Sequence, residues 1–210
     1  MRGIIFTITQ PETILAMPLF TFGIISKEDI MKYRQYNIEG CENPKVTRQL
    51  YALLTAHSKA FSLIYFRYDR KEKYSRTTQK IEKKLKNYEI GSREVKKWPG
   101  TETLDERSIY KMVTYRIDEE SLWDIIDVFD TTKTVWDWDY PKYPMDICFY
   151  REDGLAWFYI TAHERHNTLI LDDSMGLSVL DIESIGVKLV AEKKPDENDL
   201  LYNMCFTQSV

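Results

Sequence analysis

The stretch DICFYREDGLAWFYITAHERHNTLILD, residues 146–172, decides the fold of this chain. β-branched and aromatic residues dominate three parts of it, residues 146–151, 155–163 and 167–172, and such residues favour β-strands. The tripeptide Glu152-Asp153-Gly154 joins the first two parts, and Asp-Gly is a strong signal for a tight hairpin turn. The stretch therefore predicts a meander of antiparallel strands.

The sequence on either side of this meander predicts both helices and strands. Their order does not alternate as it would in a doubly wound parallel sheet. We therefore predict an α+β fold, with a mainly antiparallel sheet and helices packed on one face. The expected helices cover residues 26–36, 44–57, 79–88, 118–129 and 177–185, and the further strands cover residues 3–9, 60–68, 108–117 and 187–192.

The length of the chain and the positions of its loop residues predict how it divides into domains. A chain of 210 residues, 43% of them hydrophobic, suits one large domain or two small ones with a substantial core. Gly91-Ser92 and Pro99-Gly100 bracket a loop and predict a boundary within residues 91–107. We expect an N-terminal α+β half with a basic helical segment, residues 1–97, and a C-terminal α+β half with the meander, residues 98–210.

The cysteines and the N-terminal segment bear on the compartment. Cys41, Cys148 and Cys205 lie far apart and form no CxxC pair, which is typical of reduced thiols in a cytoplasm. The apolar N-terminal segment is interrupted by polar residues and lacks a cleavage site, and no apolar run reaches the ~20 residues that span a bilayer. We expect a cytoplasmic protein with no membrane segment, no metal and no other cofactor.

Charge is distributed unevenly along the chain. The net charge of −4 excludes a uniformly basic nucleic-acid binder, yet residues 67–97 hold 12 Lys or Arg against 5 acids. Basic residues interleaved with Tyr68, Tyr74, Tyr88 and Trp98 fit single-stranded nucleic acid. The acids within the block favour a solvated helix face instead, so nucleic acid is the less favoured partner.

The segment from residue 117 to residue 153 is acidic and aromatic, with 11 acids and 3 bases. Within it, the loop WDWDYPKYPMD at residues 136–146 combines tryptophan, carboxylates and stiffening prolines, which is typical of a recognition surface. We predict that this segment binds a protein partner with a basic surface. The predicted partner-binding residues are Asp124, Asp127, Trp136, Asp137, Trp138, Asp139, Tyr140 and Tyr143.

The tetrapeptide His163-Glu164-Arg165-His166 is the strongest candidate for chemistry. Its spacing differs from the HExxH of zinc enzymes, and it follows a predicted strand rather than lying on a helix. We therefore favour a hydrogen-bonding role for His163 and Glu164. The alternative is acid–base or metal chemistry together with nearby carboxylates, namely Asp137, Asp139, Asp146, Asp172 and Asp173.

Residues 98–190 resemble a group of uncharacterised proteins from Gram-positive bacteria. The shared pattern is Trp-x-Gly-Thr, then Trp-x-x-Pro-x-x-Pro-x-Asp-[Leu/Ile]-Cys-Phe, then Asp-Gly-x-x-Trp, and a strand that ends in His-Glu. Its segments are matched by Trp98–Thr101, Trp138–Phe149, Asp153–Trp157 and His163-Glu164, with departures at Pro99 and at Tyr140-Pro141. The resemblance implies no known activity, although small acidic proteins of this kind often occur beside toxin genes as immunity proteins.

These features together predict a function in binding rather than in catalysis. We expect a non-enzymatic protein-binding module, of the type of an immunity protein or antitoxin, that inhibits a basic partner. Two alternatives stay open. One is an enzyme that acts on a nucleotide or nucleic acid through His163, Glu164 and clustered carboxylates, and the other is a nucleic-acid binder through residues 67–97.

Overall fold

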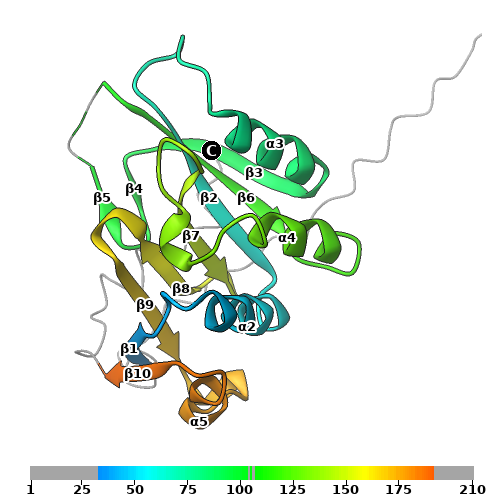
Figure 1. Ribbon diagram of the computed structural model, residues 1–210, viewed down its shortest axis with the longest axis vertical. Helices are drawn as coiled ribbons and strands as arrows, with labels where there is room; N and C mark the ends of the chain where they lie inside the picture. Colours follow the sequence, from blue (N-terminus) through cyan, green and yellow to red (C-terminus); the bar gives the residue numbers. More distant parts are fainter. Residues whose placement is uncertain (1–32, 104, 106, 192–210) are drawn as a thin grey trace, which may run out of the picture.

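One antiparallel sheet organises the chain. The computed structural model describes residues 33–191 except 104 and 106. The sheet has eight strands in the order β10-β1-β9-β8-β7-β2-β6-β3 (Figure 1). The strands are β1 (Arg34–Glu39), β2 (Ala60–Arg67), β3 (Glu89–Val95), β6 (Ile109–Arg116), β7 (Met145–Tyr150), β8 (Ala156–Thr161), β9 (His166–Leu171) and β10 (Lys188–Ala191).

The predicted meander is confirmed as β7, β8 and β9. These strands pair in antiparallel register, with Phe149 opposite Phe158 and Phe158 opposite Leu169. Every residue of β8 is buried, because neighbouring strands flank it and both of its faces are covered. The Asp-Gly turn between β7 and β8 places Gly154 at φ 82°, a conformation that glycine adopts without steric cost.

Strand β2 lies at the centre of the sheet and pairs with β6 on one side and β7 on the other. Strands from before and after residue 97 therefore share one sheet. The side chains of β2 alternate between the two faces: Phe61, Leu63 and Tyr65 enter the main core, whereas Ile64 enters a smaller cluster on the opposite face.

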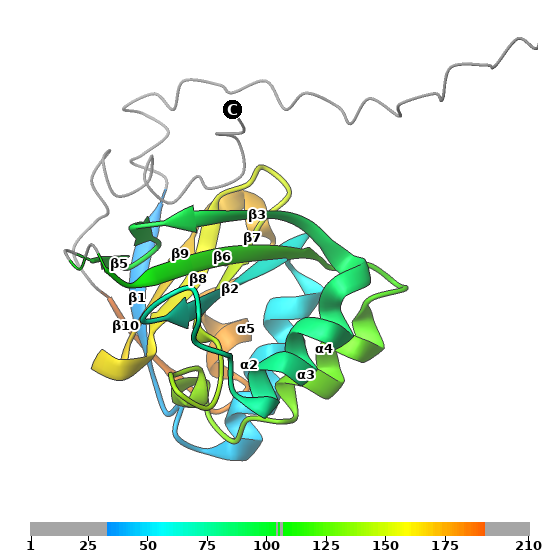
Figure 2. The same ribbon diagram turned by 90° about the horizontal axis from the view of Figure 1, so that it is seen from above.

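The helices cover one face of the sheet, as predicted (Figures 1 and 2). Three of them begin with a side-chain cap, since the side chains of Asn43, Ser75 and Ser178 each accept a backbone N–H of the first turn. The α+β fold class, with a mainly antiparallel sheet, is thus confirmed. The helices are α2 (Pro44–Ala56), α3 (Arg76–Leu85), α4 (Leu122–Phe129) and α5 (Val179–Glu183).

Shorter elements join these parts. The hairpin of β4 (Lys97–Trp98) and β5 (Thr101–Glu102) forms a small second sheet. Four 3₁₀ turns complete the described chain: η1 (Lys86–Tyr88), η2 (Val135–Asp137), η3 (Ala162–Glu164) and η4 (Asp173–Met175). Within the described residues, no helix is both long enough and apolar enough to cross a bilayer.

Two sequence predictions about secondary structure are wrong. Residues 34–36 belong to β1 rather than to a helix, because β1 pairs with both β9 and β10 and the Asn167 side chain bonds the N–H and C=O of Ile38. Residues 89–95 form β3 rather than a loop, since pairing with β6 accommodates Gly91 at an irregularity. The strand expected at residues 3–9 lies outside the described residues.

Aromatic side chains fill the core between the helices and the sheet. The ring of Phe129 from α4 packs on Tyr51, Phe61, Phe149 and Trp138, with ring centroids 4.7–6.0 Å apart. Trp138 is completely buried, and its indole N–H donates to the hydroxyl of Tyr51 at 2.7 Å. Trp138 therefore anchors its loop to the core rather than facing solvent.

Replacement of Trp138 should destabilise the fold. We predict that Trp138→Ala lowers the free energy of unfolding by about 3–5 kcal/mol, because it leaves a cavity and removes the N–H that donates to the Tyr51 hydroxyl. Trp123→Ala is the matched control, since that indole is 75% exposed, and it should change stability by less than about 0.5 kcal/mol. Urea unfolding, followed by circular dichroism, measures the stability of both variants. Equal stabilities of Trp138→Ala and Trp123→Ala would contradict the burial of Trp138.

Candidate functional site

The predicted partner-binding residues lie in two separate places. Asp124 and Asp127 are on α4, where they face α3. The other six residues belong to the loop that runs from η2 towards β7. The structure therefore provides two surfaces to consider, one on α4 and one on the loop.

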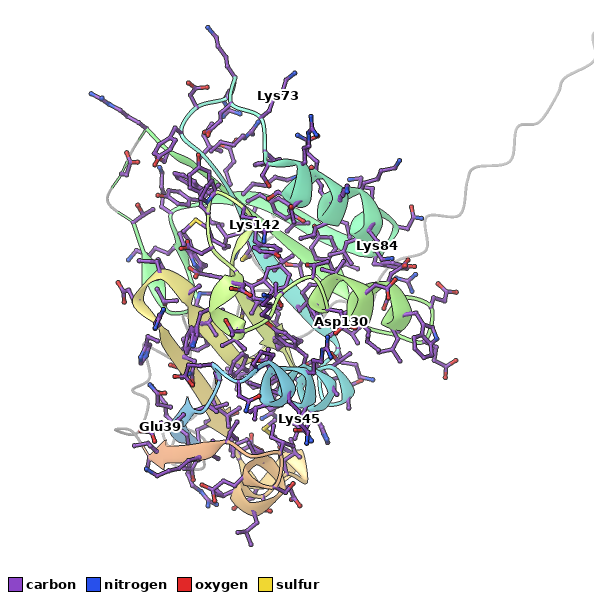
Figure 3. The ribbon with its side chains drawn as sticks, in the orientation of Figure 1. Glu39, Lys45, Lys73, Lys84, Asp130 and Lys142 are labelled. Atoms are coloured by element: carbon purple, nitrogen blue, oxygen red, sulfur yellow. The ribbon has the colours of Figure 1, made fainter. Side chains whose placement is uncertain are left out.

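Lys84 of α3 neutralises part of the acidic face of α4. Figure 3 shows Lys84 between α3 and α4. Its ammonium lies 3.0 Å from a carboxylate oxygen of Asp124 and 2.9 Å from one of Asp127. The Tyr88 hydroxyl also donates to Asp124 at 2.8 Å. This hydrogen bond, followed by the one from Lys84, lowers the pKa of Asp124. Asp124 is therefore committed to the contact between α3 and α4, whereas Asp127 pairs with Lys84 and still keeps 68% of its side chain exposed.

The acids around α4 outnumber the bases that touch them. Residues 118–130 contain six acids and no base. Besides Lys84, Arg116 pairs with Asp118 and Glu120, and Arg48 pairs with Asp130. Three bases against six acids leave this region with a net charge of −3. The region around α4 therefore carries more negative than positive charge.

An exposed tryptophan lies within this acidic region. Trp123 is 75% exposed, and Asp127 follows it at i+4 on the same face of α4. Glu120, in the turn just before α4, has a side chain that is 77% exposed. The sequence analysis missed Trp123, although helical spacing gave a signal: Trp123 falls outside the buried stripe formed by Ile125, Val128 and Phe129.

Contacts with neighbouring and with distant segments hold the loop from η2 to β7. The Asp137 carboxylate accepts the backbone N–H groups of Lys133 at 2.6 Å and Thr134 at 3.1 Å, and so closes a capping box. The Tyr140 hydroxyl donates to Glu72 at 2.7 Å. Asp137 and Tyr140 therefore hold the loop in place, and each keeps a partly exposed side chain.

Two members of the predicted set face the core, which corrects the prediction for them. Trp138 is completely buried and Tyr143 is 7% exposed, with its hydroxyl bonded to the carbonyl of Thr131. Aromatic residues near acids were expected to face a partner, but burial of these rings stabilises the loop instead. Trp136 is partly buried against the core, and Asp139 is partly exposed.

Asp146 joins three segments that are far apart in the sequence. Its carboxylate accepts the indole N–H of Trp98 at 2.8 Å and the backbone N–H of Ala162 at 2.8 Å. A bulge in β7 places Asp146 there, because Ser62 faces Cys148 whereas Ile64 faces Met145. Asp146 itself adopts φ 44°, which is uncommon for a residue with a side chain.

Burial dominates the electrostatics of this carboxylate. Asp146 is 2% exposed, and burial raises its pKa to about 6 against the opposing effect of its two hydrogen bonds. His163 lowers this pKa and Asp139 raises it by smaller amounts. Since both oxygens already accept N–H groups, the geometry supports a structural role for Asp146 at the junction of β4, β7 and η3.

His163 and Glu164 lie on the surface beside this junction. They belong to η3, which packs against η2, and their side chains are 46% and 64% exposed. The imidazole Nε2 is 3.6 Å from the Glu164 carboxylate. Across the described part of the chain, no group of three or more His, Cys, Asp or Glu side chains is arranged to hold a metal ion.

Helix α3 presents the basic block to solvent. Its buried stripe is Thr78, Ile81 and Leu85, so Lys80 and Lys83 are exposed on the outer side. The predicted basic amphipathic helix is therefore present, although it begins at Arg76 rather than Gln79. The cationic side of α3 lies next to the anionic side of α4, and Lys84 connects them.

The buried carboxylate should make stability depend on pH in a defined direction. The folded-state pKa of Asp146 is about 6, above its ordinary value of 3.8, so folding favours the protonated form. Its contribution is complete below about pH 4 and is lost as pH rises through 6, a change of about 3 kcal/mol.

The measurement compares wild type with Asp146→Asn by urea unfolding at pH 4, 5, 6 and 7. We predict that the wild-type stability falls relative to the variant by about 3 kcal/mol over this range, because all other carboxylates are common to both proteins. If the variant is too unstable to measure, NMR titration of the Asp146 carboxyl group in the wild type measures the same pKa directly. A difference that does not depend on pH would contradict the assignment.

No family model, curated protein or solved structure matches the chain. The resemblance of residues 98–190 to proteins from Gram-positive bacteria therefore stays a prediction, and the contacts of the chain itself are the basis for its function.

Proposed function

We propose that the protein is a non-enzymatic protein-binding module, an immunity-type or antitoxin-like cytoplasmic inhibitor of a basic partner. The observation that carries this proposal is Trp123, an indole 75% exposed within a strongly acidic region. The proposal keeps the acidic, aromatic chemistry expected from the sequence and centres it on α4 rather than on Trp138.

An exposed tryptophan on a short helix favours recognition over stability. A large aromatic ring in solvent contributes little to the fold, but it contributes much to an interface when a partner buries it. The other side of α4, with Ile125, Val128 and Phe129, already anchors the helix to the core. Trp123 is therefore held on a rigid element, which reduces the entropy lost on binding.

The charges around Trp123 favour a cationic partner. Asp127 follows at i+4, Glu120 precedes in the adjoining turn, and both side chains are more than two-thirds exposed. Arginine suits such a site, because its guanidinium can stack on the indole while it donates to a carboxylate. A basic protein surface would be attracted at long range and held at short range by the same residues.

The exposed ion pairs of Lys84 explain how a partner could bind α4 without unfolding the protein. Lys84 bridges Asp124 and Asp127, but its side chain is 36% exposed, and exposed ion pairs contribute only about 0–1 kcal/mol. A partner cation can therefore replace Lys84 at Asp127 at little cost. Asp124 keeps its hydrogen bond from Tyr88, so the contact between α4 and η1 stays intact.

The test begins with the full chain immobilised and exposed to extract of its native host at about 50 mM salt. Proteins retained by wild type and not by the empty matrix are identified by mass spectrometry and purified. With a purified partner, Trp123→Ala should raise the dissociation rate by at least tenfold. Asp127→Lys should slow association, and the effect should shrink at higher salt.

Leu180→Ala is the matched control, because Leu180 is 77% exposed on α5 and lies outside the acidic region. It should leave both rates unchanged. Circular dichroism should give the same folded signal for all variants. If the purified partner binds Trp123→Ala and Asp127→Lys as it binds wild type, α4 is not the binding surface and the proposal fails.

A further inference from the structure

A cleft of about 450 Å³ lies at one end of the sheet, away from the acidic face of α4. Three segments form it: the loop after β2, the end of β3 and the start of β6. These segments lie beside one another because β6 pairs with both β2 and β3 (Figure 1). The cleft is lined by Asp69, Arg70, Glu94, Val95, Lys96, Arg107, Ser108, Ile109 and Tyr110.

The acids of the cleft are occupied by contacts within the protein. Glu94 forms a two-point pair with Arg70, at 2.9 and 3.1 Å. The Asp69 carboxylate accepts the backbone N–H groups of Lys71 at 2.6 Å and Glu72 at 3.0 Å. Glu94 is therefore paired within the protein, whereas both bonds to Asp69 use only one of its two carboxylate oxygens.

The other two cations of the cleft are placed to bind an anion. The Lys96 ammonium donates to the carbonyls of Asp105 at 2.6 Å and Ser108 at 2.9 Å, which fixes its position and leaves one N–H. Arg107 is exposed, and its guanidinium has no partner among the described residues. With three cations and two carboxylates, the lining has a net charge of +1, and the Asp105 carboxylate, which accepts the backbone N–H of Arg107 at 2.9 Å, lies beside it.

The lining of the cleft also includes apolar residues beside these cations. Val95, Ile109 and Tyr110 line it and are partly buried. The ring of Tyr110 packs against Phe66 and Trp98, with centroids 5.0 and 5.1 Å away. The Lys96 ammonium lies 5.8 Å from the centre of the same ring. An anion bound here would thus have an apolar surface next to it.

We infer that this cleft binds a nucleoside phosphate, with the phosphate on Arg107 and Lys96 and the base against Val95, Ile109 and Tyr110. The volume is within the range of small-molecule sites, about 300–1,000 Å³. Arg and Lys are the usual ligands of phosphate groups, and aromatic rings accept any base by stacking. The same chemistry is present in a free nucleotide and at the phosphorylated end of a single strand.

The experiment titrates the full chain with adenosine monophosphate by calorimetry at about 50 mM salt. Adenosine and inorganic phosphate are titrated separately, and each should bind at least tenfold more weakly than the nucleotide. Arg107→Ala should weaken nucleotide binding at least tenfold, because it removes a charged phosphate ligand. Lys83→Ala on α3 is the matched control, an exposed cation outside the cleft, and it should bind as wild type does.

Titration with a short oligothymidylate, with and without a 5′-phosphate, distinguishes a free nucleotide from the phosphorylated end of a single strand as the ligand. Tighter binding of the phosphorylated strand than of the mononucleotide, with the same loss in Arg107→Ala, identifies a strand end as the ligand. Equal or weaker binding of the strand identifies the free nucleotide. The inference is overturned if no nucleotide binds, if phosphate alone binds as well as the nucleotide, or if Lys83→Ala loses as much affinity as Arg107→Ala.

Discussion

The buried carboxylate of Asp146 is the contact on which the arrangement of the C-terminal half depends. It accepts N–H groups from Trp98 and Ala162, which lie 48 and 16 residues away in the chain. A buried carboxylate is unfavourable unless hydrogen bonds satisfy it. The two donors therefore fix the hairpin of β4 and β5, and the turn η3, next to Asp146. The hairpin fits closely: a Cβ at Gly100 would lie 2.9 Å from the Tyr159 ring.

The helical layer depends on a different constraint, the aromatic core around Phe129. Because Phe129 and Trp138 pack together, α4 and the loop before β7 are fixed relative to β2 and β7. This packing buries Trp138, which the sequence analysis predicted to lie on the surface. It leaves Trp123 on the outside of α4. The exposed ring and the buried ring are therefore consequences of the same helix orientation.

Much of the fold could be predicted because local patterns and tertiary contacts agree. The meander, α2, α4 and β2 follow from alternation, helical spacing and the Asp-Gly turn. The predictions failed where pairing decides the structure: β1 and β3 lie beside β9, β10 and β6, and such long-range pairing overrides local propensity. For the site, the acids on α4 were predictable from composition. The burial of Trp138 was not, because a loop sequence does not reveal which of its rings the core accepts.

The separation of charge across the helices limits what the protein can bind. Residues 67–97 carry a net charge of +7 and the rest of the chain −11, yet α3 and α4 are neighbours joined through Lys84. A partner with a uniformly positive surface would meet α4 favourably and α3 unfavourably, so approach is favoured in one orientation. A partner with a uniformly negative surface would be attracted by α3 and repelled by α4. The cleft that includes Arg107 is formed by β2, β3 and β6, whereas Trp123 lies on α4, so the two proposed sites use different parts of the molecule.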